Sequence, residues 1–125
     1  MPTIFSKIIA GEIPSYKIYE DDKTFAFLDI HPETRGHTLI VPKLEVDRVY
    51  DLPEDYYVAL WATVKKLAAH YEKTTGSRSI LKVVGTDVPH AHVHLMPFDA
   101  DWHVGRFLDF SDAEMQEIAK SLRLS

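Results

Sequence analysis

The sequence predicts a single α+β domain, in which a five-stranded, mainly antiparallel sheet is combined with a short N-terminal helix, one long helix and a C-terminal helix. The chain has 125 residues, the usual length of one domain, and 46% of them are hydrophobic, as in average globular proteins. A long segment with helical periodicity separates two groups of short strand-like segments, an order typical of α+β folds. We therefore treat residues 1–125 as one domain, with residues 99–125 as a C-terminal extension whose packing the sequence leaves open.

Capping residues and apolar periodicity predict three helices. The first covers residues 3–10 and ends at Gly11. The clearest helix covers residues 53–75 and ends at Gly76. Its apolar stripe, at steps of three and four residues, consists of Tyr57, Leu60, Trp61, Val64, Leu67, Ala68 and Tyr71. A capping box that starts at Ser111 opens the last helix.

Five short segments have the composition and periodicity of strands. Residues 17–20 and 24–30 are separated by a polar turn, so we expect them to form a hairpin. Residues 38–41 are an apolar run that suits a buried strand, and residues 80–84 form another strand. Residues 90–98 alternate strictly, which predicts the fifth strand. The order of the strands in the sheet does not follow from these patterns.

The composition excludes several classes of function. Cysteine is absent, which excludes disulfides, thiolate zinc sites, iron–sulfur clusters and a cysteine nucleophile. Fourteen basic residues against nineteen acidic ones give a net charge of −5, and no long basic run is present, so we expect no nucleic-acid partner. The N-terminus lacks the features of a secretory signal, and no apolar stretch is long enough to span a membrane. We therefore expect a cytoplasmic location and no membrane partner.

Three histidines lie at every second position of the last predicted strand: His90, His92 and His94. Strand side chains alternate between two faces, so these imidazoles share one side and Ala91 and Val93 pack on the other. One interpretation is a half-exposed strand whose histidines have no special role. A second is a metal site, because neutral imidazole is a common ligand. At about 3.3 Å per residue, however, the outer two stand roughly 13 Å apart, so one ion could hardly bind all three, and we expect no metal and no other cofactor.

A third interpretation is chemistry on a phosphate group. Imidazole can act as a nucleophile, and neighbouring donors stabilise the charge on phosphoryl oxygens. The net charge of −5 repels an anionic ligand weakly, so donors must be provided locally. The imidazoles and the backbone N–H groups of residues 85–88, which include Thr86 and Val88, could provide them.

The segment His90–Met96, HAHVHLM, matches the alternation of histidines and apolar residues that is the signature of the histidine triad superfamily of nucleotide-binding hydrolases and transferases. Four further segments resemble this family and follow in its order: residues 4–14, 19–22, 25–32 and 36–43. The triad together with the Asp-Ile-x-Pro and Gly-His-Thr segments makes the resemblance specific. It implies the same α+β fold over roughly residues 3–98.

The resemblance also implies roles for individual residues. His92 resembles the nucleophile that attacks the α-phosphorus and forms a nucleotidyl-histidine, which water then hydrolyses. Its other ring nitrogen needs an acceptor, for which we expect a backbone carbonyl near His90. His94 would lie near the scissile bond, while His90 and His37 would form a supporting polar network. Asp29 matches the ribose-binding acid, with the alternative that it only caps the turn after its strand.

Apolar positions around the base are also matched. They are Ile4, Phe5, Ile8, Ile13, Phe27 and Ile30, of which Phe5 and Ile30 are the preferred base contacts. The chain departs from better-known branches in its shorter connection before the triad, where Asp87 replaces a small hydroxyl residue beside the phosphate. Zinc-binding members use cysteines, and Ser6 takes the place of one of them. Trp102 and His103 match no family segment, and Trp102 suits packing or an interface.

The function that the resemblance implies is a nucleotide-binding hydrolase that cleaves purine nucleoside phosphoramidates or related nucleotide derivatives at the α-phosphate. Two alternatives stay open: a nucleotide-binding regulatory module with little turnover, and a dinucleoside polyphosphate hydrolase. The presence of His92 favours an enzyme, since a binding module would not require the nucleophile. The family pairs through its long helix and a sheet edge, and Tyr57, Trp61 and Tyr71 suit an interface, so we expect a homodimer.

Overall fold

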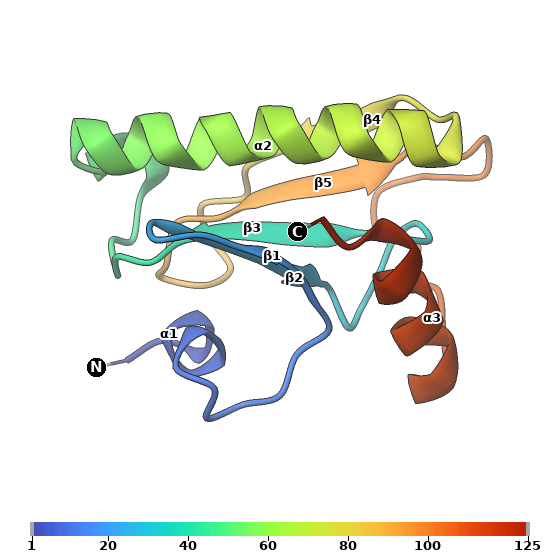
Figure 1. Cartoon of the computed structure of the whole chain (residues 1–125), viewed down its shortest axis with the longest axis horizontal. Coiled ribbons are helices and arrows are strands. Elements are labelled where there is room, and N and C mark those ends of the chain that lie inside the picture. The colour runs from blue at the N-terminus through green and yellow to red at the C-terminus, as the bar shows by residue number, and fades with distance from the viewer. Residues whose placement is uncertain (1, 125) are drawn as a thin grey trace.

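The computed structural model describes residues 2–124 and confirms the predicted α+β class (Figure 1). Its sheet has the strand order β1-β2-β3-β5-β4, and all neighbouring strands are antiparallel. The strands are β1 (Lys17–Glu20), β2 (Thr24–Leu28), β3 (Thr38–Pro42), β4 (Ser79–Lys82) and β5 (Val93–Pro97). The helices are α1 (Ile4–Ile9), α2 (Glu54–Thr75) and α3 (Asp112–Leu122), with a short 3-10 helix, η1, at Val49–Asp51. Within the described residues, no helix is both long enough and apolar enough to cross a membrane.

Different helices cover the two faces of the sheet. α2 runs along one face, and α1 lies on the other (Figure 1). The larger buried cluster includes Leu60 and Leu67 of α2, Ile40 of β3 and Leu122 of α3. The smaller cluster lies on the α1 side and consists of Phe5, Ile8, Phe25, Phe27, Leu39 and Val41. The two clusters therefore lie on opposite faces of the sheet.

The inward stripe of α2 is narrower than predicted. Its buried apolar residues are Leu60, Val64, Leu67 and Tyr71. The expectation that Tyr71 suits an interface is wrong, because its side chain is fully buried and its hydroxyl bonds to Thr38 of β3. Tyr57 is 40% exposed, because it lies in the first turn of α2, which extends beyond the strands (Figure 1). Trp61 and Ala68 are only partly buried. Thr63 is buried instead, and its hydroxyl lies 2.8 Å from the hydroxyl of Thr24 on β2.

Two strands end earlier than predicted. β2 ends at Leu28, after which the N–H of Asp29 donates to the carbonyl of His37 at 2.9 Å and the chain turns toward β3. β4 ends at Lys82, which pairs with His94 of β5, so the next two residues have no ladder partner. Both β2 and β4 end where the chain leaves the neighbouring strand. Pairing with that strand, rather than local composition, therefore determines where β2 and β4 end.

The strand that carries the histidine motif begins later than predicted. β5 begins at Val93, not at His90. The N–H of His90 donates to the carbonyl of Val88 at 2.7 Å, which makes a turn. The N–H of Ala91 donates to the carbonyl of Val46, also at 2.7 Å, so the chain here bonds to a loop instead of a strand. The first two histidines of the motif therefore precede the ladder.

The C-terminal extension packs against the sheet and the turn before β3. The N–H of Leu108 donates to the carbonyl of Pro32 at 2.8 Å. α3 contacts β1, β2 and α2, and its capping box at Ser111 is present as predicted. After α3, the N–H of Leu124 donates to the carbonyl of Ile18 on β1 at 3.0 Å.

Candidate active site

The three histidines of the motif share the α1 side of the sheet, as their alternation predicts. The ring centroids of His92 and His94 are 5.1 Å apart, and His94 pairs with Leu39 of β3. Phe5 of α1 packs against the rings of His92 and His90 at centroid distances of 5.0 and 5.8 Å. Ala91 and Val93, which lie between the histidines, and Leu95, which follows them, belong to the core cluster under α2. The alternation of faces thus holds even where the chain has left the ladder.

Backbone carbonyls determine which ring nitrogens of His92 and His90 carry a proton. Because a carbonyl only accepts, Nδ1 of His92, which lies 2.7 Å from the carbonyl of His90, is the protonated nitrogen. This confirms the expected acceptor, and in the neutral form of the His92 ring it leaves Nε2 with a free lone pair. His90 donates through Nε2 to the carbonyl of Pro42 at 2.9 Å, and its Nδ1 lies 2.8 Å from the hydroxyl of Thr3, which donates to it.

The tautomers of His37 and His94 follow from a backbone N–H in the same way. The N–H of Glu33 donates to Nδ1 of His37 at 3.0 Å, so the proton of the neutral His37 ring is on Nε2. Nε2 of His37 lies 2.8 Å from Nδ1 of His94, which must therefore accept. The proton of His94 is then on Nε2, a buried atom without a hydrogen-bond partner among the described residues. The hydrogen bonds thus direct the Nδ1 proton of His92 to a carbonyl and leave an N–H of His94 without a partner among the described residues.

Burial keeps the inner histidines neutral at physiological pH. Burial, together with the neighbouring His94 and Lys82, lowers the pKa of His37 to about 3. It also lowers the pKa of His94 to about 4, with additional contributions from His92 and Lys82. The pKa of His90 is lowered mainly by burial as well. Neutral rings are the condition for the donor and acceptor assignments above.

A cavity of about 310 Å³ lies next to these histidines and is lined mostly by apolar side chains. The predicted site residues in its lining are Ile4, Phe5, Ile8, Ile13, Phe27, Asp29, Ile30, Val88, His92 and His94. Ile30 is 67% exposed, so it lies at the rim and not in the floor. A mostly apolar cavity with a few polar groups at one end is typical of a small-molecule site.

Three predicted residues are not part of the cavity lining. His90 and His37 are buried behind the rings that line it, as expected of a supporting network. Thr86 is exposed and outside the lining, because the connection before the motif places Asp87 and Val88 there instead.

Sequence reasoning missed several lining residues: Pro14, Ser15, Leu28, His31, Leu39 and Asp87. Leu39 lies opposite both Phe27 and His94 in the ladder, so the strand register would have identified it. Asp87 stands where the resemblance implies a small hydroxyl residue, so the family pattern does not identify it as a lining residue.

Asp29 caps the turn after its strand, and its side chain also lines the cavity. Its Oδ1 accepts from the N–H of His31 at 2.8 Å, which caps the turn after β2. Its Oδ2 lies 3.6 Å from Nε2 of His37, and the side chain lines the cavity. Burial raises the pKa of Asp29, while the bond from His31 lowers it. The carboxylate therefore keeps acceptor capacity for a ligand in addition to the turn.

Asp29, His37 and His94 also have the composition of a cation site. One carboxylate oxygen and two imidazole nitrogens lie within 4.8 Å of one another. Two of these residues, however, are joined by the hydrogen bond between Nε2 of His37 and Nδ1 of His94 at 2.8 Å. An ion held at about 2.0–2.1 Å from each nitrogen would have to replace this bond. The expectation of a site without metal stays a prediction.

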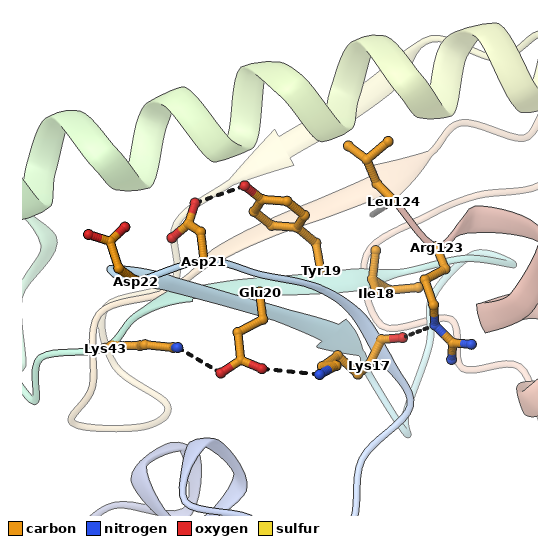
Figure 2. Close-up of a pocket in the computed structure, with 9 residues that line it drawn as sticks. All are labelled: Lys17, Ile18, Tyr19, Glu20, Asp21, Asp22, Lys43, Arg123 and Leu124. Carbon is orange, nitrogen blue, oxygen red and sulfur yellow. Dashed lines mark hydrogen bonds and ion pairs between the residues drawn. The ribbon is translucent and has the colours of Figure 1, made fainter.

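A second, more open depression of about 560 Å³ lies along β1 and the C-terminus (Figure 2). Its charges already pair with one another, because Glu20 bonds to Lys17 at 3.1 Å and to Lys43 at 2.6 Å. Arg123 donates to the carbonyl of Lys17 at 2.9 Å (Figure 2). No histidine lines this depression, so the smaller cavity is the candidate active site.

Comparison with known proteins assigns the chain to a family. The profile of the HIT domain matches residues 10–101, and the chain therefore belongs to the HIT, or histidine triad, family. The chain is 36% identical over 126 residues to an uncharacterised HIT-like protein of Methanocaldococcus jannaschii, covering 96% of this chain and 98% of that protein. It is 38% identical over 96 residues to an adenosine 5′-monophosphoramidase of Saccharomyces cerevisiae, covering 75% of this chain and 61% of that enzyme.

Solved structures share the whole architecture. A HIT-like protein from Bartonella henselae, described as involved in cell-cycle regulation, is 29% identical and superposes with a TM-score of 0.86. The match covers 97% of this chain and 93% of that one, so the C-terminal extension is included almost completely. Relatives in the family include hydrolases, which supports a hydrolase as the kind of protein.

Proposed function

We propose that this chain is a nucleotide-binding hydrolase that cleaves purine nucleoside phosphoramidates or related nucleotide derivatives at the α-phosphate. The observation that carries the proposal is the hydrogen bond from Nδ1 of His92 to the carbonyl of His90. It leaves the lone pair of Nε2 on a ring that lines a mostly apolar cavity. Asp29 and His94 line the same cavity, and the buried Nε2–H of His94 has no hydrogen-bond partner among the described residues.

The reaction consists of two displacements. In the first, the lone pair of His92 Nε2 forms a bond to the α-phosphorus, and the phosphorus–nitrogen bond to the leaving amine breaks. The amine departs with that electron pair and takes a proton from water. In the second, a water oxygen attacks phosphorus, the bond to Nε2 breaks, and its electron pair returns to His92 while the water proton goes to solvent. The Nε2–H of His94 stabilises the phosphoryl charge by hydrogen bonding.

An enzyme is favoured over a binding module because the site contains more than a binding pocket. A module that only binds nucleotides requires the apolar cavity and Asp29, but not a tautomer of His92 that frees Nε2. A dinucleoside polyphosphate hydrolase would use the same nucleophile and differ only in the leaving group. A turnover assay of the purified protein with adenosine and guanosine phosphoramidates and with dinucleoside polyphosphates separates these functions. No turnover of any of them would leave the binding module as the better description.

Asp29→Asn tests the ribose contact. The amide oxygen can still accept from the N–H of His31, so the turn is retained, but the side chain loses its charge and one acceptor. A hydrogen bond to a charged group contributes about 1.5–3 kcal/mol, so we expect AMP to bind about 10–100-fold more weakly in calorimetry. The 2′,3′-dideoxy analogue serves as the control, because its affinity should be the same for both proteins. Equal loss for AMP and for this analogue would contradict the ribose contact.

We also propose that the chain forms a homodimer through α2 and the edge strand β4. Exposed apolar side chains support this surface: Tyr57 and Val58 on α2, Leu81 on β4 and Val83 just after it. Sedimentation at micromolar concentration should give the dimer mass, and Leu81→Glu should give the monomer. Val104→Glu, at a 74% exposed position in the extension, should remain dimeric. A monomer mass for the unaltered chain would refute the dimer. The cytoplasmic location, which no observation on the structure bears on, stays a prediction.

A further inference from the structure

The C-terminal segment, residues 99–108, makes several hydrogen bonds to one residue of the turn between β2 and β3. That residue is Glu33, which is only 7% exposed although it carries a carboxylate. Oε1 of Glu33 accepts from Nε1 of Trp102 at 3.0 Å, and Oε2 lies 3.4 Å from Nζ of Lys82. A buried carboxylate needs such partners, because its burial without them is costly. Trp102, for which the sequence indicated only packing or an interface, therefore holds the side chain of Glu33.

The same segment also holds the backbone on both sides of Glu33. Arg106 donates to the carbonyl of Glu33 from Nε at 3.0 Å and from Nη2 at 2.8 Å, and Asp99 pairs with Nη2. On the other side, the N–H of Leu108 donates to the carbonyl of Pro32 at 2.8 Å. This carbonyl belongs to the same planar peptide unit as the N–H of Glu33, so holding one orients the other.

The N–H of Glu33 is the group on which two catalytic-site tautomers depend. It donates to Nδ1 of His37 at 3.0 Å, which leaves the proton of that ring on Nε2. His37 then donates to His94, whose proton is left on the free Nε2. If the peptide unit rotated, Nδ1 of His37 would lose its donor. The two rings could then exchange their donor and acceptor functions, and His94 would no longer have a proton on Nε2.

We propose that the C-terminal segment is a positioning element for catalysis: through Trp102, Arg106 and Leu108 it orients the N–H of Glu33, which keeps His37 and His94 in the tautomers that leave a donor on His94. This inference rests on the proposed function for its catalytic consequence. Its structural part, the control of the tautomers, can be measured without a substrate. None of these three residues lines the cavity, so they act through Glu33 and not on the ligand.

Nuclear magnetic resonance of the protein labelled with ¹⁵N-histidine tests the structural part directly. Correlations between ring protons and ring nitrogens distinguish the Nε2–H from the Nδ1–H tautomer. We expect a single Nε2–H tautomer for His37 and His94 in the unaltered chain. Arg106→Ala and Trp102→Phe, alone and combined, should give averaged nitrogen signals for these two rings. The tautomer of His92 should not change, because it depends on the carbonyl of His90.

Arg123→Ala is the matched control. Arg123 also donates to a backbone carbonyl, that of Lys17, but at the depression along β1, which contains no histidine (Figure 2). Its removal should leave all histidine tautomers unchanged. Arg106→Lys, which keeps the charge and one donor, should restore part of the single-tautomer signal. It also provides a milder variant if Arg106→Ala does not fold.

Kinetics with an adenosine phosphoramidate test the catalytic part. Arg106→Ala should lower kcat about tenfold, less than the 10²–10³-fold that the removal of a catalytic donor itself costs. KM and the affinity for AMP should stay within about twofold, because the cavity lining is intact. The proposal is overturned if His37 and His94 keep single Nε2–H tautomers in the double variant. It is also overturned if these single tautomers are lost but kcat is unchanged. Absence of turnover in the unaltered chain would instead refute the proposed function, while the tautomer measurement would still decide whether the segment positions the two rings.

Discussion

His92→Asn should bind AMP almost as tightly as the unaltered chain and lose about 10⁴-fold or more in turnover, the scale expected when an enzyme loses its nucleophile. The asparagine side chain can retain a hydrogen bond to the carbonyl of His90 through its amide, but it has no lone pair that can attack phosphorus. Phe5 and Asp29, which line the cavity, remain in place. Binding and turnover therefore separate, and they are measured by calorimetry and by a phosphoramidate assay.

His94→Ala is the control that distinguishes the nucleophile from a donor. It removes the free Nε2–H, whose contribution to transition-state stabilisation is about 10²–10³-fold, together with the acceptor of the hydrogen bond from His37. Acid quench of the unaltered chain with a labelled substrate should place the nucleotidyl group on His92. The assignment is wrong if the label is on another residue or if His92→Asn keeps near-normal turnover.

The sequence predicts the architecture well because its signals are local. The stripe of α2 repeats at three- and four-residue steps around Leu60 and Leu67, and the capping box at Ser111 marks the start of α3 within one residue. The alternation of His92 and His94 with core residues identifies the side of the chain that carries the site, even where the ladder is absent.

The remainder depends on contacts between distant segments, which local patterns do not contain. Leu39 joins the cavity only because β3 lies between β2 and β5. The histidine segment leaves the ladder because Ala91 finds the carbonyl of Val46 as its partner. Glu33 belongs to no sequence motif. Its role follows only from its hydrogen bonds with Trp102 and Arg106, which lie in residues 99–108, far from it in the sequence. The periodicity and composition of the sequence identify the helices, the strands and their buried faces. The register of the strands and the packing of the loops determine which of these elements contact one another.

Acidification should destabilise the folded chain strongly, because the inner histidines are held neutral. Burial lowers the pKa of His37 to about 3 and that of His94 to about 4, whereas an unfolded histidine has a pKa near 6.5. The unfolded chain therefore binds two protons that the folded chain does not bind until the pH approaches 4 and 3. The stability that these neutral rings provide is complete above about pH 6.5 and is lost progressively as the pH falls.

The expected loss is large on the scale of protein stability. Each proton that the unfolded chain binds and the folded chain does not lowers the free energy of unfolding by about 1.4 kcal/mol per pH unit. The two rings together therefore lower it by about 4 kcal/mol between pH 6.5 and pH 5. Urea denaturation at pH 7.5 and pH 5.0 measures this difference. His37→Gln and His94→Gln should each reduce the slope of stability against pH, since glutamine has no proton to bind, whereas the exposed His103→Gln should leave it unchanged. Equal stability at the two pH values would show that both rings are protonated in the folded chain, which would also contradict the tautomers assigned to His37 and His94.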